Sequence, residues 1–453
     1  MLSRSDMDHD LRRLTGAIAK THPAVGKTVS KQTLNALGDN LARGLPEEAS
    51  VLDFLDVTQQ LVDTVQGGHI VVYPRGLRAR NTFSRPTRTL PVRLERLPGG
   101  EAVVARVAPG VDSSLLGQRV FRLDSRSIDS LVRRSAYFAG GSDGNNLSGA
   151  RNRATQRLGR YIDWAYGEAD SFQLALQDST VVLPADRPRD RAHEAKLQKN
   201  KQKAPKRRPI AYGLDSARRI AVIDINSFSG YDPYNLRWPK VWRRVLAKAE
   251  ADSAQALIID LRDNGGGRSA NIRQVLRRLE PQAVKLYEPW TMPASGWVHA
   301  SPLLKLGFVP AMLLGSGSEQ RFGRTMRHRV QPSNGVRYGG PVYVLINSGT
   351  FSAASATAAM LKSSGRATLI GEEAGGNYHE TYAGLFSTIK LRRTGLRVRM
   401  PHLRIPLAVD ERVQPFGKTL QPDVILPKTL ADVLDARDLV LLQTLELIAA
   451  KLR

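Results

Sequence analysis

The stretch NSGTFSAASATAAMLKSSGR, residues 347–366, separates two apolar runs of the chain. PVYVLIN (341–347) precedes and overlaps it, and ATLIGE (367–372) follows it. Short continuous apolar runs of this kind are typical of strands that are buried on both faces of a parallel sheet. The Ala-rich residues 353–364 between them predict a helix. The sequence therefore predicts a strand, a Ser/Gly/Thr turn and a helix that begins next to Ser352.

Ser352 stands where this turn meets the predicted helix. Free backbone N–H groups and the helix dipole favour negative charge at such a position, which suits both a serine nucleophile and an oxyanion. A serine there is also a common helix N-cap, whose hydroxyl bonds a backbone N–H. On the local sequence alone, capping is the simpler interpretation.

A second apolar run, ALIIDLR (256–262), leads into Asp263, Asn264 and the glycines 265–267. Glycines after a buried strand allow close backbone approach and a turn of exposed N–H groups. One of these groups and the Ala353 N–H together would form an oxyanion hole. A plain tight turn is the alternative interpretation. The βαβα order of the region indicates an α/β core.

The two motifs, LIIDLRDNGGG (257–267) and VYVLINSGTFSAASATAAMLKSSGRATLIGEEAGG (342–376), resemble those of the tail-specific or C-terminal-processing serine peptidases. The resemblance covers about residues 220–427 and includes the late run GKTLQPDVILP. It implies an α/β fold with a crotonase- or ClpP-like spiral of ββα units. It also implies a serine-type endopeptidase with Ser352 as nucleophile. The implied oxyanion donors are Ala353 and Gly266, with Gly265 as the alternative to Gly266.

Many members of this family pair the serine with a lysine beyond the GE motif. Asn377 stands at that position here, and Lys390 lies too far along the chain to replace the lysine. Members of the lysine type also often carry a glutamate three residues after the nucleophile, where this chain has Ser355. The sequence therefore does not resemble a Ser–Lys enzyme.

The chain is more similar to the branch that contains the tricorn protease core and the interphotoreceptor retinoid-binding protein. In that branch a histidine base follows N-terminal helices, and His69 in QGGHI (66–70) fits this place. The earlier THP (21–23) also resembles the branch. A neutral histidine suits proton transfer near neutral pH. The alternative is that His69 caps a turn or fills a hydrogen-bonding role.

In that branch a serine precedes the histidine, and a late glutamate completes the site. Gly68 stands in place of the serine. Glu411 is the expected counterpart of the glutamate, and Asp410 and Glu372 are alternatives. Each of these acids could instead be a solvated surface group.

Apolar spacing and composition divide the chain into four parts. Residues 1–84 are expected to form a helical N-terminal subdomain carrying His69, and residues 85–185 a β-rich middle subdomain. The basic, apolar-poor residues 186–209 are expected to be an exposed linker or insertion. Residues 210–453 are expected to form the α/β peptidase core, ending in a helix over about 430–452.

The composition excludes several classes of site. There is no cysteine, so disulfides, thiolate nucleophiles and cysteine-held metals are excluded. The histidines show no paired metal-binding spacing, and neither a phosphate loop nor a dinucleotide fingerprint occurs. No metal or other cofactor is therefore expected. No signal peptide or transmembrane stretch is visible, so the chain as it stands is expected to be cytoplasmic, or periplasmic or secreted if its N-terminus was removed.

The expected partner is a peptide or unfolded protein substrate, and the sequence does not indicate an oligomeric state. The net charge of +25 is compatible with anionic partners, but the basic residues are spread along the chain and no nucleic-acid module is recognisable, so nucleic acid is not expected. Two other functions stay open. One is a catalytically inactive ligand- or peptide-binding protein on the same fold, and the other is an anion-binding protein that uses residues 186–209.

Overall fold

The computed structural model describes residues 1–74, 89–139, 142–144, 147–167, 169–186, 208–232, 234–293, 319–322, 329–435 and 437–453 of the 453-residue chain. The basic linker predicted over 186–209 lies outside these residues except at its ends. Within the described ranges, no helix combines the length and the apolar character needed to cross a membrane.

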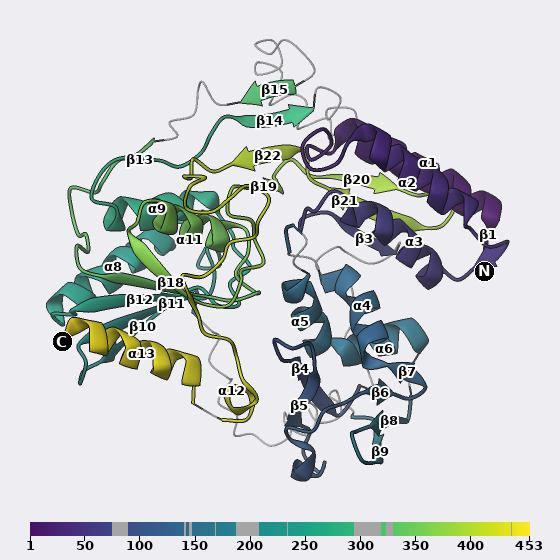
Figure 1. Ribbon diagram of the computed structural model, residues 1–453, viewed down its shortest axis with the longest axis horizontal. Coiled ribbons are helices and arrows are strands. Elements are labelled where there is room, and N and C mark those ends of the chain that lie inside the picture. Colours follow the sequence, from purple (N-terminus) through teal and green to yellow (C-terminus); the bar gives the residue numbers. More distant parts are fainter. Residues whose placement is uncertain are drawn as a thin grey trace.

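The C-terminal half is built on a mostly parallel sheet with the strand order β10-β11-β12-β17-β18-β23 (Figure 1). Its strands are β10 (Ile210–Asp215), β11 (Ile220–Ile225), β12 (Ala256–Asp260), β17 (Val342–Ile346), β18 (Ala367–Gly371) and β23 (Val424–Ile425). Only β10 is antiparallel to its neighbour in this order. The two apolar runs next to the candidate motifs are β12 and β17, which lie side by side in the middle of the sheet.

Helices cover both faces of this sheet. Helices α8 (Arg237–Ala251), α9 (Ser269–Leu279) and α11 (Ala353–Ser363) share one apolar cluster with it. Helix α13 (Leu439–Leu452) contributes Leu445 and Ile448 to a second cluster with strand residues such as Ile258 and Leu345. Because both faces are covered, the central strands β12 and β17 are made almost entirely of apolar residues. The predicted α/β class is confirmed, and the ββα spiral stays a prediction.

The N-terminal helices pack with a hairpin from the far end of the chain. These elements are α1 (Arg4–Thr21), α2 (Lys31–Arg43), α3 (Val51–Asp63), β3 (Val71–Pro74), β20 (Ser387–Lys390) and β21 (Leu396–Met400). Strand β3 pairs antiparallel with β21, which pairs with β20. Hairpin residues such as Ile389 and Val398 belong to the same apolar cluster as Leu14 and Phe54 of the helices. The purple helices and the green hairpin lie together in Figure 1.

The middle region combines short strands and helices, which also belong to the apolar cluster of the N-terminal helices. It contains β4 (Val92–Arg96), β5 (Ala102–Val107), η1 (Ser113–Leu115), β6 (Arg122–Leu123), β7 (Arg126–Ser127), α4 (Ile128–Ala139), α5 (Ser148–Gln156), α6 (Leu158–Tyr166), β8 (Ser171–Ala175) and β9 (Thr180–Pro184).

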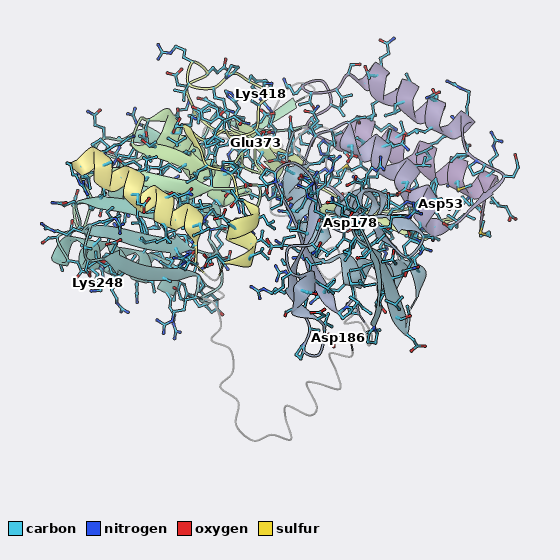
Figure 2. The ribbon with its side chains drawn as sticks, turned by 60° about the horizontal axis from the view of Figure 1, so that its bottom comes forward. Asp53, Asp178, Asp186, Lys248, Glu373 and Lys418 are labelled. Atoms are coloured by element: carbon cyan, nitrogen blue, oxygen red, sulfur yellow. The ribbon has the colours of Figure 1, made fainter. Side chains whose placement is uncertain are left out.

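A further sheet lies between the large sheet and the N-terminal helices in the view of Figure 1, with the order β15-β14-β22-β19. Its strands are β14 (Trp290–Pro293), β15 (Glu319–Phe322), β19 (Glu380–Ala383) and β22 (Leu403–Pro406). The remaining short elements are β1 (Leu2–Ser3), β2 (Glu48–Ala49), β13 (Val284–Lys285), β16 (Arg329–Val330) and α12 (Leu430–Leu434). Figure 2 shows Lys248 of α8 and Asp53 of α3 near opposite ends of the molecule. The single helix predicted over 430–452 is two helices, α12 and α13.

Candidate active site

Ser352 occupies the N-cap position of α11, but its side chain does not cap the helix. Its backbone has φ 56° and ψ −120°, a conformation that residues other than glycine rarely adopt. Such strain costs about 1–3 kcal/mol and is concentrated at functional sites. The simple capping interpretation therefore does not describe this serine, because its hydroxyl points to another partner.

That partner is His69, whose Nε2 lies 3.3 Å from Ser352 Oγ. The distance is slightly longer than an ideal hydrogen bond, as is common in active sites without substrate. His69 follows the turn after α3 and comes just before β3, so the pairing of β3 with β21 fixes the strand beside it. The imidazole ring packs against Phe351 at 4.6 Å and against Phe386 at 6.2 Å between ring centroids.

Burial, together with the nearby Arg399 guanidinium, lowers the pKa of His69 to about 3. The imidazole is therefore neutral near pH 7. To accept a proton from Ser352 Oγ at Nε2, the neutral ring must carry its hydrogen on Nδ1. Among the described residues, Nδ1 of His69 has no hydrogen-bond partner. The expected group that orients the base is thus not in contact with it.

Glu411, the predicted orienting acid, is exposed and has no bond to His69 or Ser352 in the part of the chain that is described. It lines a cavity of about 400 Å³ together with His379, Glu380, Arg404 and Phe416. The two alternatives have other partners. Asp410 binds the side chain of Arg412, and Glu372 accepts a bond from the Lys428 N–H.

The glycine loop after β12 lies against the nucleophile turn. The Thr350 hydroxyl donates to the Leu261 carbonyl at 2.8 Å, and the Phe351 N–H donates to the Asn264 carbonyl at 2.9 Å. Gly266 has φ 93°, and a Cβ added to it would lie 2.8 Å from the Ala353 nitrogen. The structure therefore brings the two predicted oxyanion donors, Gly266 and Ala353, next to each other.

The two donors differ in their present bonding. The Gly266 N–H donates to the Asn264 side chain at 2.8 Å, so this bond must open before Gly266 can bind an oxyanion. Gly265, the alternative donor, is exposed, and a Cβ added to it would meet no atom within 4 Å. The Ala353 N–H belongs to the first turn of α11, where N–H groups have no partner within the helix.

Ser355 and Asn377 mark the two departures from the lysine-type enzymes. The Ser355 hydroxyl donates to the Ser352 carbonyl, and a Cβ on Gly376 would lie only 2.0 Å from Ser355 Oγ. No larger side chain fits between them. Asn377, at the lysine position, has a buried side-chain oxygen without a partner among the described residues, and Lys390 is exposed on β20.

His22 of the THP segment packs against the turn at Gly67 that precedes His69. It is 1% exposed, its Nδ1 accepts the Ala24 N–H, and its ring lies 3.6 Å from the place that a Cβ on Gly67 would take. Sequence reasoning did not single out Asp143, whose carboxylate binds the Gly68 N–H at 2.7 Å. A lone acid in the glycine-rich run GGSDGNN (140–146) gives no recognisable signal.

The described residues contain no group of three or more His, Cys, Asp or Glu side chains arranged to hold a metal ion. Two other histidines among the described residues bond to neighbouring groups. His379 bonds the Gln414 carbonyl at 2.8 Å, and His402 bonds the Ser387 hydroxyl at 2.7 Å.

Comparisons with known proteins identify the family of one domain and the fold. Residues 219–382 match the family described as Peptidase family S41, which confirms the resemblance seen in the two motifs. The search of curated proteins returned no match. Mature CPAF has a similar structure, with a TM-score of 0.64 and 14% identity over 98% of this chain and 96% of that chain. Mature CPAF complexed with lactacystin gives a TM-score of 0.66 and 14% identity, and 98% of each chain is covered. The likeness shows a shared fold over nearly the whole chain.

Proposed function

We propose that this chain, a serine-type peptidase that contains a peptidase family S41 domain over residues 219–382, hydrolyses peptide bonds through an acyl-enzyme on Ser352 with His69 as the base. The observation that carries the proposal is the 3.3 Å approach of His69 Nε2 to Ser352 Oγ, at a serine that does not cap its helix. A peptidase acts on peptide or protein substrates.

In the proposed first step, Ser352 Oγ attacks the carbonyl carbon of a peptide bond while His69 Nε2 takes the hydroxyl proton. The imidazolium then donates this proton to the leaving amine as the C–N bond breaks. Water attacks the resulting ester, again with His69 as base, and the acid product leaves. The pKa of His69, lowered by burial, keeps the ring in its proton-accepting form at neutral and mildly acidic pH.

The negative charge on the substrate oxygen would be stabilised by the Ala353 N–H and by a second N–H from the loop at Gly265 and Gly266. Gly266 would serve once the bond to the Asn264 side chain has opened, and Gly265 would serve without that change. Loss of one such donor raises the barrier by about 3 kcal/mol in related chemistry. We assign no step to Glu411, because no contact joins it to either catalytic group in the described residues.

The test is a comparison of Ser352→Ala and His69→Ala with the parent protein. Each variant should lose at least ~1,000-fold in kcat/KM on casein or an unstructured peptide, because nucleophile and base act as a unit. A fluorophosphonate probe should label the parent at Ser352 and leave Ser352→Ala unlabelled.

Matched controls come from groups outside the site. His9→Ala removes an exposed histidine of α1, and Ser171→Ala removes an exposed serine at the start of β8. Both should keep parental turnover and labelling. Turnover of the peptide by Ser352→Ala at the parental rate would show that the proposal is wrong.

A further inference from the structure

Asp143 is a buried carboxylate beside the site, 1% exposed, in the short segment between α4 and α5. Its Oδ1 accepts the Gly68 N–H at 2.7 Å, and the Asn377 N–H also donates to the carboxylate. The Thr381 hydroxyl reaches Oδ2 at a longer 3.4 Å. All of these donors are uncharged groups, and two of them are backbone amides from distant parts of the chain.

The backbone of residues 143 and 144 makes two further hydrogen bonds, one to the segment that precedes Asn377 and one to the turn that carries His69. The Asp143 N–H donates to the Gly375 carbonyl at 2.6 Å, and the Gly144 N–H donates to the Gln66 carbonyl at 2.8 Å. Gln66 and Gly68 belong to the turn that carries His69. Residues 375–377 lie against the nucleophile segment, because the Gly375 N–H bonds the Thr350 carbonyl at 3.0 Å. Asp143 therefore connects the turn of the base with the surroundings of the nucleophile.

The fit at Gly68 is close enough to exclude a side chain there. A Cβ on Gly68 would lie 2.5–2.6 Å from backbone atoms of Ser142, the residue before Asp143. The segment 142–144 thus fills the space that any side chain before the histidine would need. Because Gly68 has no side chain, Ser142 can pack against it, and this places the Asp143 carboxylate within hydrogen-bond distance of the Gly68 N–H.

This connection matters because, in the part of the chain that is described, no hydrogen bond to Nδ1 holds the His69 ring. The position of Nε2 relative to Ser352 Oγ then depends on the backbone of the turn and on ring packing against Phe351. A displacement of about 1 Å between reacting groups is enough to lower a rate ~100-fold.

We infer that Asp143 is a positioning residue of this peptidase, whose carboxylate holds the Gly68–His69 turn against residues 375–377 and so sets the distance from His69 to Ser352. The inference rests on the proposed function, in which His69 is the base. Asp143 does not touch the reacting atoms, and it acts only through the backbone on both sides.

The charge state of Asp143 should affect this role. Burial and, to a lesser extent, the neighbouring Glu380 raise the pKa of Asp143, and the bonds from Gly68, Asn377 and Thr381 oppose them; the net pKa is about 7. Glu380 forms an ion pair with Arg404, in which Nη2 lies 2.5 Å from Oε2, and the Tyr382 hydroxyl donates to Glu380 Oε1 at 2.6 Å. The ionised carboxylate accepts all of its bonds, whereas protonation converts one oxygen into a donor and weakens the connection.

The experiment compares Asp143→Asn with Asp10→Asn. Asp10 is a fitting control because it is fully buried and its Oδ2 accepts two backbone N–H groups, of Arg393 and Thr394, and the Thr394 hydroxyl. Like Asp143, it joins the N-terminal part to a distant segment, but it does so away from the site. Unfolding midpoints in urea, kcat, KM and the rate of fluorophosphonate labelling are measured for both variants.

Asp143→Asn should lower kcat and the labelling rate ~10- to 100-fold with little change in KM. Asp10→Asn should leave both rates unchanged at a comparable loss of stability. The parental kcat should rise with pH through about 7, and this step should be absent in Asp143→Asn. If Asp143→Asn does not fold, Thr381→Val removes only the longest bond, and the rise in kcat should then move to higher pH.

The inference is overturned if Asp143→Asn turns over and labels at the parental rates, or if Asp10→Asn loses activity to the same degree. Failure of the proposed function has a different signature. In that case Ser352→Ala would keep its turnover, whereas failure of the positioning role leaves Ser352→Ala inactive and Asp143→Asn active.

Discussion

Ser352 lowers the stability of the protein in two ways, through its backbone conformation and through the cap that it does not make. With φ 56° it holds a conformation in which a Cβ is strained, and its hydroxyl satisfies none of the free N–H groups of α11. A well-placed N-cap stabilises a helix by about 1 kcal/mol, so this serine gives up that stabilisation. The cost is consistent with a residue kept for its chemistry rather than for the fold.

Replacing Ser352 by glycine should stabilise the protein relative to Ser352→Ala. Glycine adopts positive φ without the Cβ clash, while alanine keeps the clash, so the difference should be about 1 kcal/mol in the free energy of unfolding. Urea unfolding of the two inactive variants measures it. Equal stability, or a more stable Ser352→Ala, would show that the backbone at Ser352 is not strained.

At the scale of elements, strand β3 links the base to the rest of the protein. It begins two residues after His69, and Val72 on it pairs with Val398 of β21, both fully buried. The pairing joins segments more than 300 residues apart in the chain. The base therefore reaches the nucleophile only when the N-terminal helices are packed on the β20–β21 hairpin.

Val72→Ala should lower stability by about 2 kcal/mol, from two buried methyl groups and the cavity that they leave. It should also lower kcat more than a surface change of the same size, because the strand next to His69 loses packing. Val182→Ala, at a valine that is 64% exposed, is the control and should change neither quantity. Unfolding midpoints and initial rates check both expectations, and a parental kcat in a destabilised Val72→Ala would contradict the link.

The pairing of β3 with β21 joins distant segments, and contacts of this kind could not be predicted from the sequence. The nucleophile turn and the glycine loop could be located because each follows a buried strand within a few residues, whereas their roles came from the resemblance of the two motifs to the peptidase family. His69 could be proposed only from the resemblance to a branch of the family in which a histidine base follows N-terminal helices. Asp143 was missed because a bond to a backbone N–H 75 residues away leaves no pattern in the sequence. For Glu411, the resemblance and its position along the chain predicted a role, but no described contact joins it to His69 or Ser352.

At the scale of the whole molecule, two apolar clusters meet around a site made of polar and ionisable groups. The N-terminal helices, the middle region and the β20–β21 hairpin share one cluster, and the large sheet with α8, α9 and α11 shares the other. His22 and Asp143 are buried near this junction, each 1% exposed. Their pKa values are shifted in opposite directions, so acid should change stability through both.

The sign follows from which state binds more protons. Burial, together with His402, lowers the pKa of His22 to about 3. Between about pH 3 and 6.5 the unfolded chain therefore binds the proton, and stability falls as pH falls. His69 acts in the same direction. Asp143 acts in the opposite one, because its pKa is raised to about 7 and the folded state binds the proton first. From pH 7 to 5, we expect about 2 kcal/mol to be lost through His22 and about 2 kcal/mol to be regained through Asp143.

Single variants separate these contributions. His22→Gln should make the free energy of unfolding less sensitive to acid between pH 7 and 5, and Asp143→Asn should make it more sensitive, each by about 2 kcal/mol over that range. Ser171→Ala, which removes an exposed and non-titrating side chain at the start of β8, should leave the dependence unchanged. Urea unfolding at pH 5, 6 and 7 gives the three slopes. Burial at the junction is the main cause of both pKa shifts. A parental pH dependence in both His22→Gln and Asp143→Asn would therefore contradict this account of burial, because it would mean that neither pKa is shifted in the folded state.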